Sequence, residues 1–214
     1  MKPKYDKLLS NVAFSFNPRP STKVAKPVPC IEFVGHTSAV HGVSFSPGND
    51  FLLSCSRDAS VRLWSIELEI CLCAYKSHNY PVWDVQWSPT GHYFATASHD
   101  QTARVWAMDT SHPRRILVGH LADVDAVAWH PNTNYIATGS ADRTVRLWDV
   151  QTGDCVRIFT GHRGGVRSLA MSPDGKSMAS GQGLGPRAHS TISAKLKPPL
   201  CPALCPPLYS PYKH

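Results

Sequence analysis

The chain has 214 residues, of which 42% are hydrophobic and 17% are charged, and its net charge is +7. This composition is that of a globular protein rather than a disordered one. The charge is uneven: residues 1–29 carry +5 and residues 182–214 carry +4, which leaves −2 for the residues between them. Because the basic residues lie at the two ends, we expect no direct sequence-specific nucleic-acid binding by the folded part.

The seven cysteines are scattered and odd in number, so they do not predict a disulfide framework. A zinc site at Cys201, Cys205 and His214 lacks a second ligand pair at finger spacing, and we expect no metal and no cofactor. No stretch approaches the roughly 20 apolar residues of a membrane span, and no apolar run follows the first lysines. These features predict a soluble intracellular protein with no membrane contact.

The first segment, residues 1–29, contains five prolines among lysines and serines and has no period of either 2 or 3.6. It is expected to be a flexible leader. Residues 30–34 precede Gly35-His36 in the same way that residues 71–75 precede the corresponding pair, Ser77-His78. They are therefore expected to form a strand of a preceding unit.

A repeat of 42 residues organises the chain from residue 30 to residue 181. It is marked by His36, His78, His120 and His162, by Asp58, Asp100 and Asp142, and by Trp64, Trp106 and Trp148. Gly-His and Trp-Asp pairs at a period of about 40–45 residues are typical of WD40 blades in a β-propeller. Kelch-like or sandwich strands are the alternative that the period leaves open.

Each unit is expected to hold four strands. Alternation predicts an inner strand at residues 40–46, 82–88, 124–130 and 166–172, a second at 51–56, 93–98 and 135–140, and a third at 61–64, 103–106 and 145–148. A fourth, edge strand leads to the next Gly-His pair. One inner-strand position holds a bulky apolar residue, expected to pack where neighbouring blades meet: Phe45, Trp87, Trp129 and Met171.

The units are expected at about residues 35–76, 77–118, 119–160 and, in part, 161–181. In the fourth unit the expected Asp and Trp fall on Leu184 and Ser190, and the Pro-rich residues 182–214 predict a disordered tail, with a polyproline-type partner motif as the alternative. The expected fold is an all-β, incomplete WD40 propeller with three full blades and a partial blade at each end. Since a ring needs about four to eight blades, we expect a truncated or spliced form of a longer propeller or an incomplete gene model. Domain-swapped or partner-completed closure is the alternative.

The repeated His, Asp and Trp residues are interpreted as structural sets: His36, Asp58 and Trp64; His78, Asp100 and Trp106; His120, Asp142 and Trp148. A His between a turn Asp and a buried indole can complete a hydrogen-bond network with a strand Ser or Thr. The alternative, a Ser-His-Asp catalytic triad, needs one such arrangement in one cleft, whereas this one is repeated. We therefore expect no enzyme, no catalytic residue and no small-molecule substrate.

Positions that differ between units are the candidates for binding a particular partner. The position five residues after each His holds His41, Trp83, Asp125 and Arg167, and the position before each turn Asp holds Arg57, His99 and Ala141. In propellers these positions line the mouth of the central channel, so all of them except Ala141 are candidate partner-binding residues. The alternative is that they are solvated loop residues, with Trp83 buried instead.

Residues 78–84, 119–124, 139–150 and 155–162 resemble the WD40 subunit of the general transcription factor TFIID, its fifth TBP-associated factor, and the related subunit of SAGA-type coactivators. The resemblance covers residues 30–181. It implies a nuclear scaffold that holds histone-fold subunits during assembly of RNA polymerase II initiation complexes. The alternatives are a WD40 adaptor of another complex, such as a ubiquitin ligase, or a non-functional truncated isoform. A ligase adaptor is expected to carry Arg two residues after Trp-Asp, where this chain has Gln151.

Overall fold

The computed structural model describes residues 30–183 and the backbone of residues 192–194. The expected leader and most of the expected tail lie outside the described residues. Within the described ranges every regular element is a β-strand. No helix in this part of the chain is long and apolar enough to cross a membrane.

The strands form successive antiparallel sheets, each taken in chain order, which we call blades. The first blade contains β1 (Val40–Phe45), β2 (Phe51–Ser56), β3 (Val61–Ser65) and β4 (Ile70–Tyr75). The second contains β5 (Val82–Trp87), β6 (Tyr93–Ser98), β7 (Thr102–Ala107) and β8 (Arg115–Val118). The third contains β9 (Val124–Trp129), β10 (Tyr135–Ser140), β11 (Val145–Asp149) and β12 (Cys155–Phe159). The fourth contains β13 (Val166–Met171), β14 (Met178–Gln182) and β15 (Ile192–Ala194).

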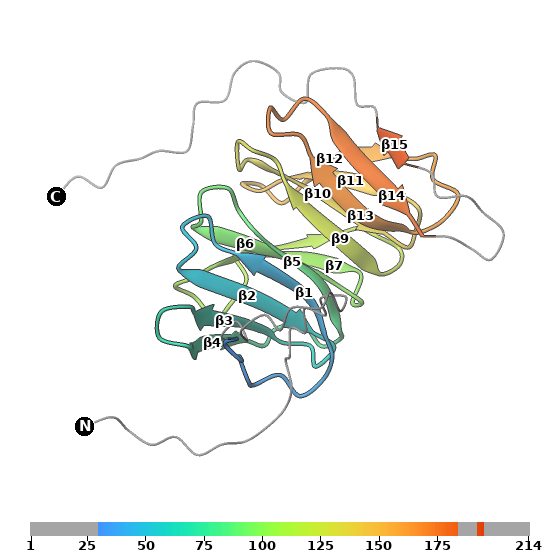
Figure 1. Cartoon of the computed structure of the whole chain (residues 1–214). Helices are drawn as coiled ribbons and strands as arrows, with labels where there is room; N and C mark the ends of the chain where they lie inside the picture. Colours follow the sequence, from blue (N-terminus) through green and yellow to red (C-terminus); the bar gives the residue numbers. More distant parts are fainter. Residues whose placement is uncertain (1–29, 184–191, 195–214) are drawn as a thin grey trace, which may run out of the picture.

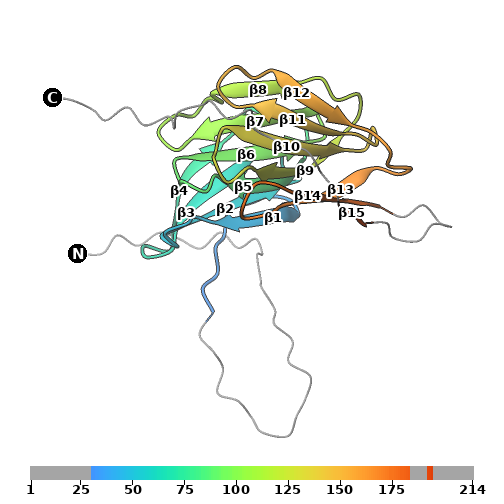
Figure 2. The same ribbon diagram turned by 90° about the horizontal axis from the view of Figure 1, so that it is seen from above.

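The four blades lie side by side in an open arc, as the two views in Figures 1 and 2 show. The first strand of each blade is its inner strand, and β1, β5, β9 and β13 contact one another in that order. We call the end at which the inner strands begin the upper rim, and the end at which they finish the lower end. This architecture confirms the prediction of an all-β, incomplete propeller.

The hydrophobic core is divided among the interfaces between blades. One cluster joins Leu53 and Leu63 of the first blade to Val85 and Phe94 of the second. Comparable clusters join the second blade to the third and the third to the fourth. A sheet with one apolar face must bury that face against another layer, so each blade is stabilised mainly by its neighbours.

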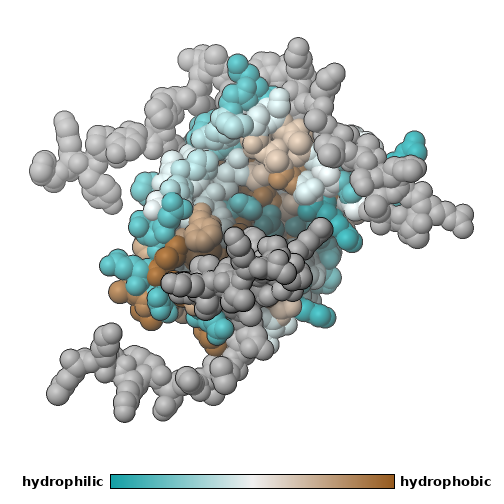
Figure 3. All heavy atoms as spheres, viewed as in Figure 1, coloured by the Kyte–Doolittle hydropathy of each residue, from teal (hydrophilic) through white to brown (hydrophobic). Residues whose placement is uncertain are grey.

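The surface also carries exposed apolar residues on the first blade, at Leu68, Ile70 and Leu72. Figure 3 shows hydrophobic surface gathered over the part of the molecule where Figure 1 places β1–β4. The rest of the coloured surface in this view is mixed, with teal and white areas and a second tan-to-brown area in its upper part.

The structure corrects three details of the sequence-based predictions. Residues 30–34 do not form a strand, because no neighbouring strand pairs with them within the described ranges. Phe45 is 60% exposed, since the bulky residue at this position packs on the preceding blade and β1 begins the described arc. Strand structure also continues past residue 181: β14 ends at Gln182, and β15 pairs with it through Ser180 and Ser193 inside the expected tail.

Candidate functional site

The structure brings the three His, Asp and Trp sets together inside their blades. In the first blade, Nδ1 of His36 lies 2.9 Å from Oδ2 of Asp58, and its Nε2 lies 2.7 Å from Oγ of Ser54. The Trp64 indole donates to the same Ser54 oxygen at 2.8 Å. The second and third blades repeat this arrangement with a threonine hydroxyl, at Thr96 and Thr138, in place of the serine.

The hydrogen-bond directions assign one tautomer to the histidine. Asp58 is ionised and can only accept, so Nδ1–H of His36 donates to it. The unprotonated Nε2 then accepts from the Ser54 hydroxyl, which itself accepts from the Trp64 indole. Burial lowers the pKa of His36 and outweighs the opposing effect of Asp58, so the neutral ring is favoured. Burial likewise lowers the pKa of His78 and of His120. Their two ring nitrogens are engaged within the blade, and this geometry supports a structural role.

The aspartates of these sets also shape the turns after the second strands. Oδ1 of Asp142 accepts from the Thr144 N–H at 2.9 Å and from its hydroxyl at 2.6 Å. Burial raises the pKa of Asp142, but the hydrogen bonds from Thr144, His120 and the Leu121 N–H together hold it well below its usual range. The carboxylate is therefore ionised at neutral pH and joins the turn, through Thr144, to the segment at His120 and Leu121.

The fourth blade keeps half of this network. Nε2 of His162 lies 2.7 Å from Oγ of Ser180, as in the other blades. Its Nδ1 lies 3.3 Å from Oε1 of Gln182, which also accepts from the N–H groups of Arg163 and Gly164. A neutral amide thus serves where the other blades have a carboxylate.

The four variable residues of the inner strands share one backbone feature. In each blade the ladder between the inner and second strands shifts register by one residue, and the extra residue is the variable one: His41, Trp83, Asp125 and Arg167. Such β-bulges re-aim a side chain and are common beside functional sites. The bulges therefore place four different side chains at the upper rim of the arc.

Three of the candidate residues form a ring cluster there. The His41 and Trp83 ring centroids lie 4.7 Å apart, and those of Trp83 and His99 lie 6.2 Å apart. Tyr80, which is 54% exposed, extends the cluster at 5.6 Å from His99. Trp83 is half-buried, and its indole nitrogen is buried without a hydrogen-bond partner among the described residues.

Charged groups continue the upper rim beyond the ring cluster. Nδ1 of His99 lies 2.6 Å from Oδ2 of Asp123. Burial and the nearby charge of Asp123 raise the pKa of Asp125, while Arg167 and His99 act in the opposite direction. The Arg167 side chain lies close along Gly183. A side chain at position 183 would place its Cβ 2.9 Å from Cδ of Arg167. Aromatic, acidic and basic groups thus follow one another along the rim.

Arg57 is placed differently from the other candidates. Its backbone N–H donates to Ala39 O at 2.9 Å, and its side chain is exposed outside the ring cluster. Tyr80 and Asp123 contribute to the rim but escaped prediction from the sequence. They stand two and three residues after their histidines, where the units also differ, so the same comparison between units would have found them.

Comparison with known proteins identifies the repeats. The family described as WD domain, G-beta repeat matches residues 27–65, 69–107, 111–149 and 153–185, which together exceed half of the chain. The chain belongs to the WD40 family. WD40 blades are protein-interaction scaffolds, and the varied chemistry of the upper rim agrees with this role.

The chain is similar to several curated relatives over short segments. It is 52% identical over 55 residues to the SAGA complex/transcription factor TFIID complex subunit Taf5 of Schizosaccharomyces pombe. This match covers 26% of this chain and 9% of the relative. It is 66% identical over 43 residues to transcription initiation factor TFIID subunit 5 of Arabidopsis thaliana, covering 20% and 6%. It is 46% identical over 52 residues to striatin-3 of Homo sapiens, covering 22% and 6%. Each match spans less than a tenth of the relative's length.

Proposed function

We propose that this chain is a non-enzymatic scaffold, a subunit or part of a subunit of TFIID or of a SAGA-type coactivator, that acts in the nucleus. The observation that carries the proposal is the similarity to TFIID subunit 5 proteins from several eukaryotes, at up to 66% identity over 43 residues. The WD40 repeats supply the scaffold itself.

The partners are histone-fold subunits of the same complex, and the upper rim is the surface that binds them. The bulged residues and His99 support this assignment, because their side chains differ from blade to blade while the framework around them repeats. Aromatic and arginine side chains carry much of the energy of protein interfaces. Trp83 and Arg167 supply both types at this rim.

Affinity purification of the tagged full chain from nuclear extract tests the proposal. We expect TFIID or SAGA-type subunits to co-purify and to be lost, by tenfold or more, from the variants Asp125→Lys and Arg167→Glu. The matched control for Asp125→Lys is Asp109→Lys, which makes the same charge change at an exposed turn outside the rim. Recovery of no such subunit contradicts the assignment to these complexes. Equal recovery by all the variants contradicts the rim as the binding surface.

The similarity to striatin-3 supports a second candidate, a WD40 adaptor of a different complex. The same purification separates the two candidates by the identity of the proteins recovered. A set of partners without transcription factor subunits favours the second.

A further inference from the structure

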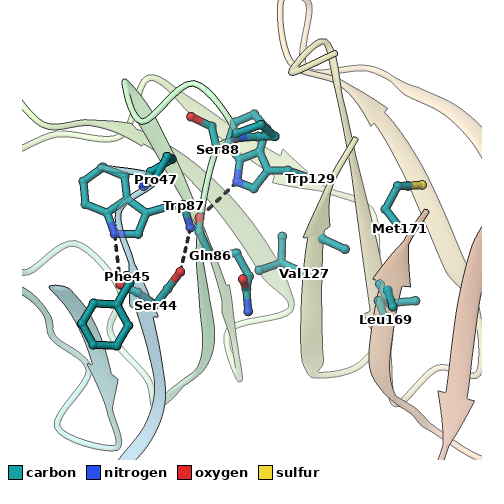
Figure 4. Close-up of a pocket in the computed structure, with 13 residues that line it drawn as sticks. Ser44, Phe45, Pro47, Gln86, Trp87, Ser88, Val127, Trp129, Leu169 and Met171 are labelled. Atoms are coloured by element: carbon teal, nitrogen blue, oxygen red, sulfur yellow. Dashed lines mark hydrogen bonds between the residues drawn. The ribbon is translucent and has the colours of Figure 1, made fainter. Parts of the chain in front are cut away.

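A pocket of about 440 Å³ lies at the lower end, where the inner strands finish. Its volume is within the range of roughly 300–1,000 Å³ typical of ligand sites. Figure 4 shows Trp87 and Trp129 in its lining, and Leu169 and Met171 of β13 further along it, beyond β9. This site is separate from the upper rim, because it lies at the opposite ends of the inner strands.

The protein itself places an indole at two of the three blade interfaces here. The Trp87 indole donates to Ser44 O of the first blade at 3.0 Å, and the Trp129 indole donates to Gln86 O of the second at 3.1 Å. Both tryptophans are 93% buried, with only 7% of their surface exposed. Each interface is therefore closed by an aromatic ring whose N–H reaches a carbonyl of the preceding inner strand.

The third interface has a different side chain at this position. The 42-residue repeat places Met171 where the earlier interfaces have Trp87 and Trp129, and it places Ala128 O where they have Ser44 O and Gln86 O. The side chain of Met171 has no N–H to donate, so within the described ranges no indole reaches Ala128 O in this way. Ala128 and Met171 both line the pocket.

A shorter side chain than at the second interface also stands at the third interface. Oδ2 of Asp84 in β5 accepts from the Val127 N–H across the second interface at 3.0 Å. The equivalent residue in β9 is Ala126, which has no acceptor and a shorter side chain. Between β9 and β13 the loops are still held together at the lower end, where His130 Nε2 lies 3.1 Å from Gly175 O. The loops after β9 and β13 are thus held together, while Ala126 and Met171 between the strands are smaller than Asp84 and Trp129 at the second interface.

We propose that this pocket binds the indole of a tryptophan side chain presented by a partner protein. The indole lies against Ala128 and Met171 and donates its N–H to Ala128 O, as the protein's own tryptophans do at the two preceding interfaces. A methionine sulfur contacts an aromatic ring favourably, and a buried ring gains free energy from the apolar area it removes from water. The proposal rests on the scaffold function only for the source of the indole, since the site itself is defined by the blades.

The first test uses the purified full chain and the probe N-acetyl-tryptophanamide. The chain has four methionines, so a ¹³C-methyl methionine spectrum is simple to assign. We expect the probe to shift the Met171 methyl signal through the ring current while the signal of Met108, which packs on the first and second blades, stays in place. The analogue methylated on the indole nitrogen is expected to bind about threefold or more weakly, because it cannot donate the hydrogen bond. Absence of a Met171 shift, or equal binding of the two probes, overturns the proposal.

The second test fills the pocket from within. Met171→Trp restores the residue of the other interfaces and is expected to abolish binding of N-acetyl-5-fluorotryptophanamide, followed by ¹⁹F NMR. Met171→Leu, which leaves the space open, is the control and is expected to bind within about threefold of the original chain. Met171→Phe fills the space without a donor and serves if the tryptophan variant does not fold. Undiminished probe binding by a folded, filled variant overturns the proposal.

These measurements are independent of the complex to which the chain belongs. Probe binding together with an absence of transcription factor subunits in the purification keeps the indole site and refutes the proposed function. Recovery of those subunits without probe binding supports the proposed function and refutes the indole site.

Discussion

His99 and Asp123 join two neighbouring blades across the upper rim, with Nδ1 of the histidine 2.6 Å from Oδ2 of the aspartate. His99 follows β6 of the second blade, and Asp123 precedes β9 of the third. Their side chains are 46% and 32% exposed, so water screens the pair and its contribution to stability is small. Its structural effect is to fix the ring cluster beside the acidic part of the rim.

The first prediction concerns the coupling of the two rim carboxylates. The charge of Asp123 helps to raise the pKa of Asp125, second to burial. The variant Asp123→Asn is expected to lower the pKa of Asp125, because the neighbouring negative charge is removed. A carboxyl ¹³C NMR titration measures this, with Asp109→Asn as the control. An Asp125 pKa that does not move contradicts the coupling.

The second prediction concerns the buried network of the third blade. Thr138→Val keeps the shape of the side chain but removes the hydroxyl that accepts from Trp148 and meets His120. Leaving a buried polar group unpaired costs about 1–3 kcal/mol, and two groups lose their partner here, so the free energy of unfolding should fall by about 2–6 kcal/mol. Urea unfolding followed by tryptophan fluorescence measures the change. Thr152→Val, at an exposed turn, is the control, and a loss equal to the control's argues against the network.

The third prediction is that stability falls as the pH is lowered below about 6.5. Burial lowers the folded-state pKa of His36, His78 and His120, so these rings stay neutral in the fold and take up protons on unfolding. Their contribution is present above the unfolded pKa of about 6.5 and is lost as the pH falls towards the folded value. Urea unfolding at pH 7.5, 6.5 and 5.5 should show a steadily decreasing free energy.

Carboxylates affect the same profile at lower pH. The depressed pKa values of Asp58, Asp100 and Asp142 give a contribution that is present above about pH 4 and lost below it, in the same direction as the histidines. Asp84 opposes them, because burial raises its folded pKa and favours the protonated fold. A free energy of unfolding that rises between pH 7.5 and 5.5 contradicts the assignment of neutral, buried histidines.

The fourth prediction concerns the turn after Asp142. Arg143 has φ of +70°, in the left-handed region, as do Ala59 and Gln101 at the same repeat position. A side chain in this region is strained, whereas glycine adopts it freely. Arg143→Gly is therefore expected to raise the unfolding free energy by about 0.5–1 kcal/mol. Gln151→Gly, at an exposed position without positive φ, is the control and should be neutral or destabilising.

The pattern of the repeats was sufficient to predict the strands and their grouping into blades, because each 42-residue unit carries the same alternation, turns and marker residues. Phe45 shows the limit of that reasoning. Every unit has a bulky apolar residue at this repeat position. Such a residue is buried only where a preceding blade lies beside it, and Phe45 has none within the described arc. Residues 30–34 show the same limit, since a strand needs a partner for its hydrogen bonds.

The sequence by itself therefore determined the WD40 blades, the residues of each His, Asp and Trp set, and the positions that vary from unit to unit. Only the tertiary structure decided that the variable residues of the inner strands lie on β-bulges, because a register shift depends on how two strands pair. It alone joined His99 to Asp123 and opened a pocket beside Met171, because both arise between blades. Local periodicity specifies each sheet, whereas contacts between sheets depend on which side chains their packing brings together.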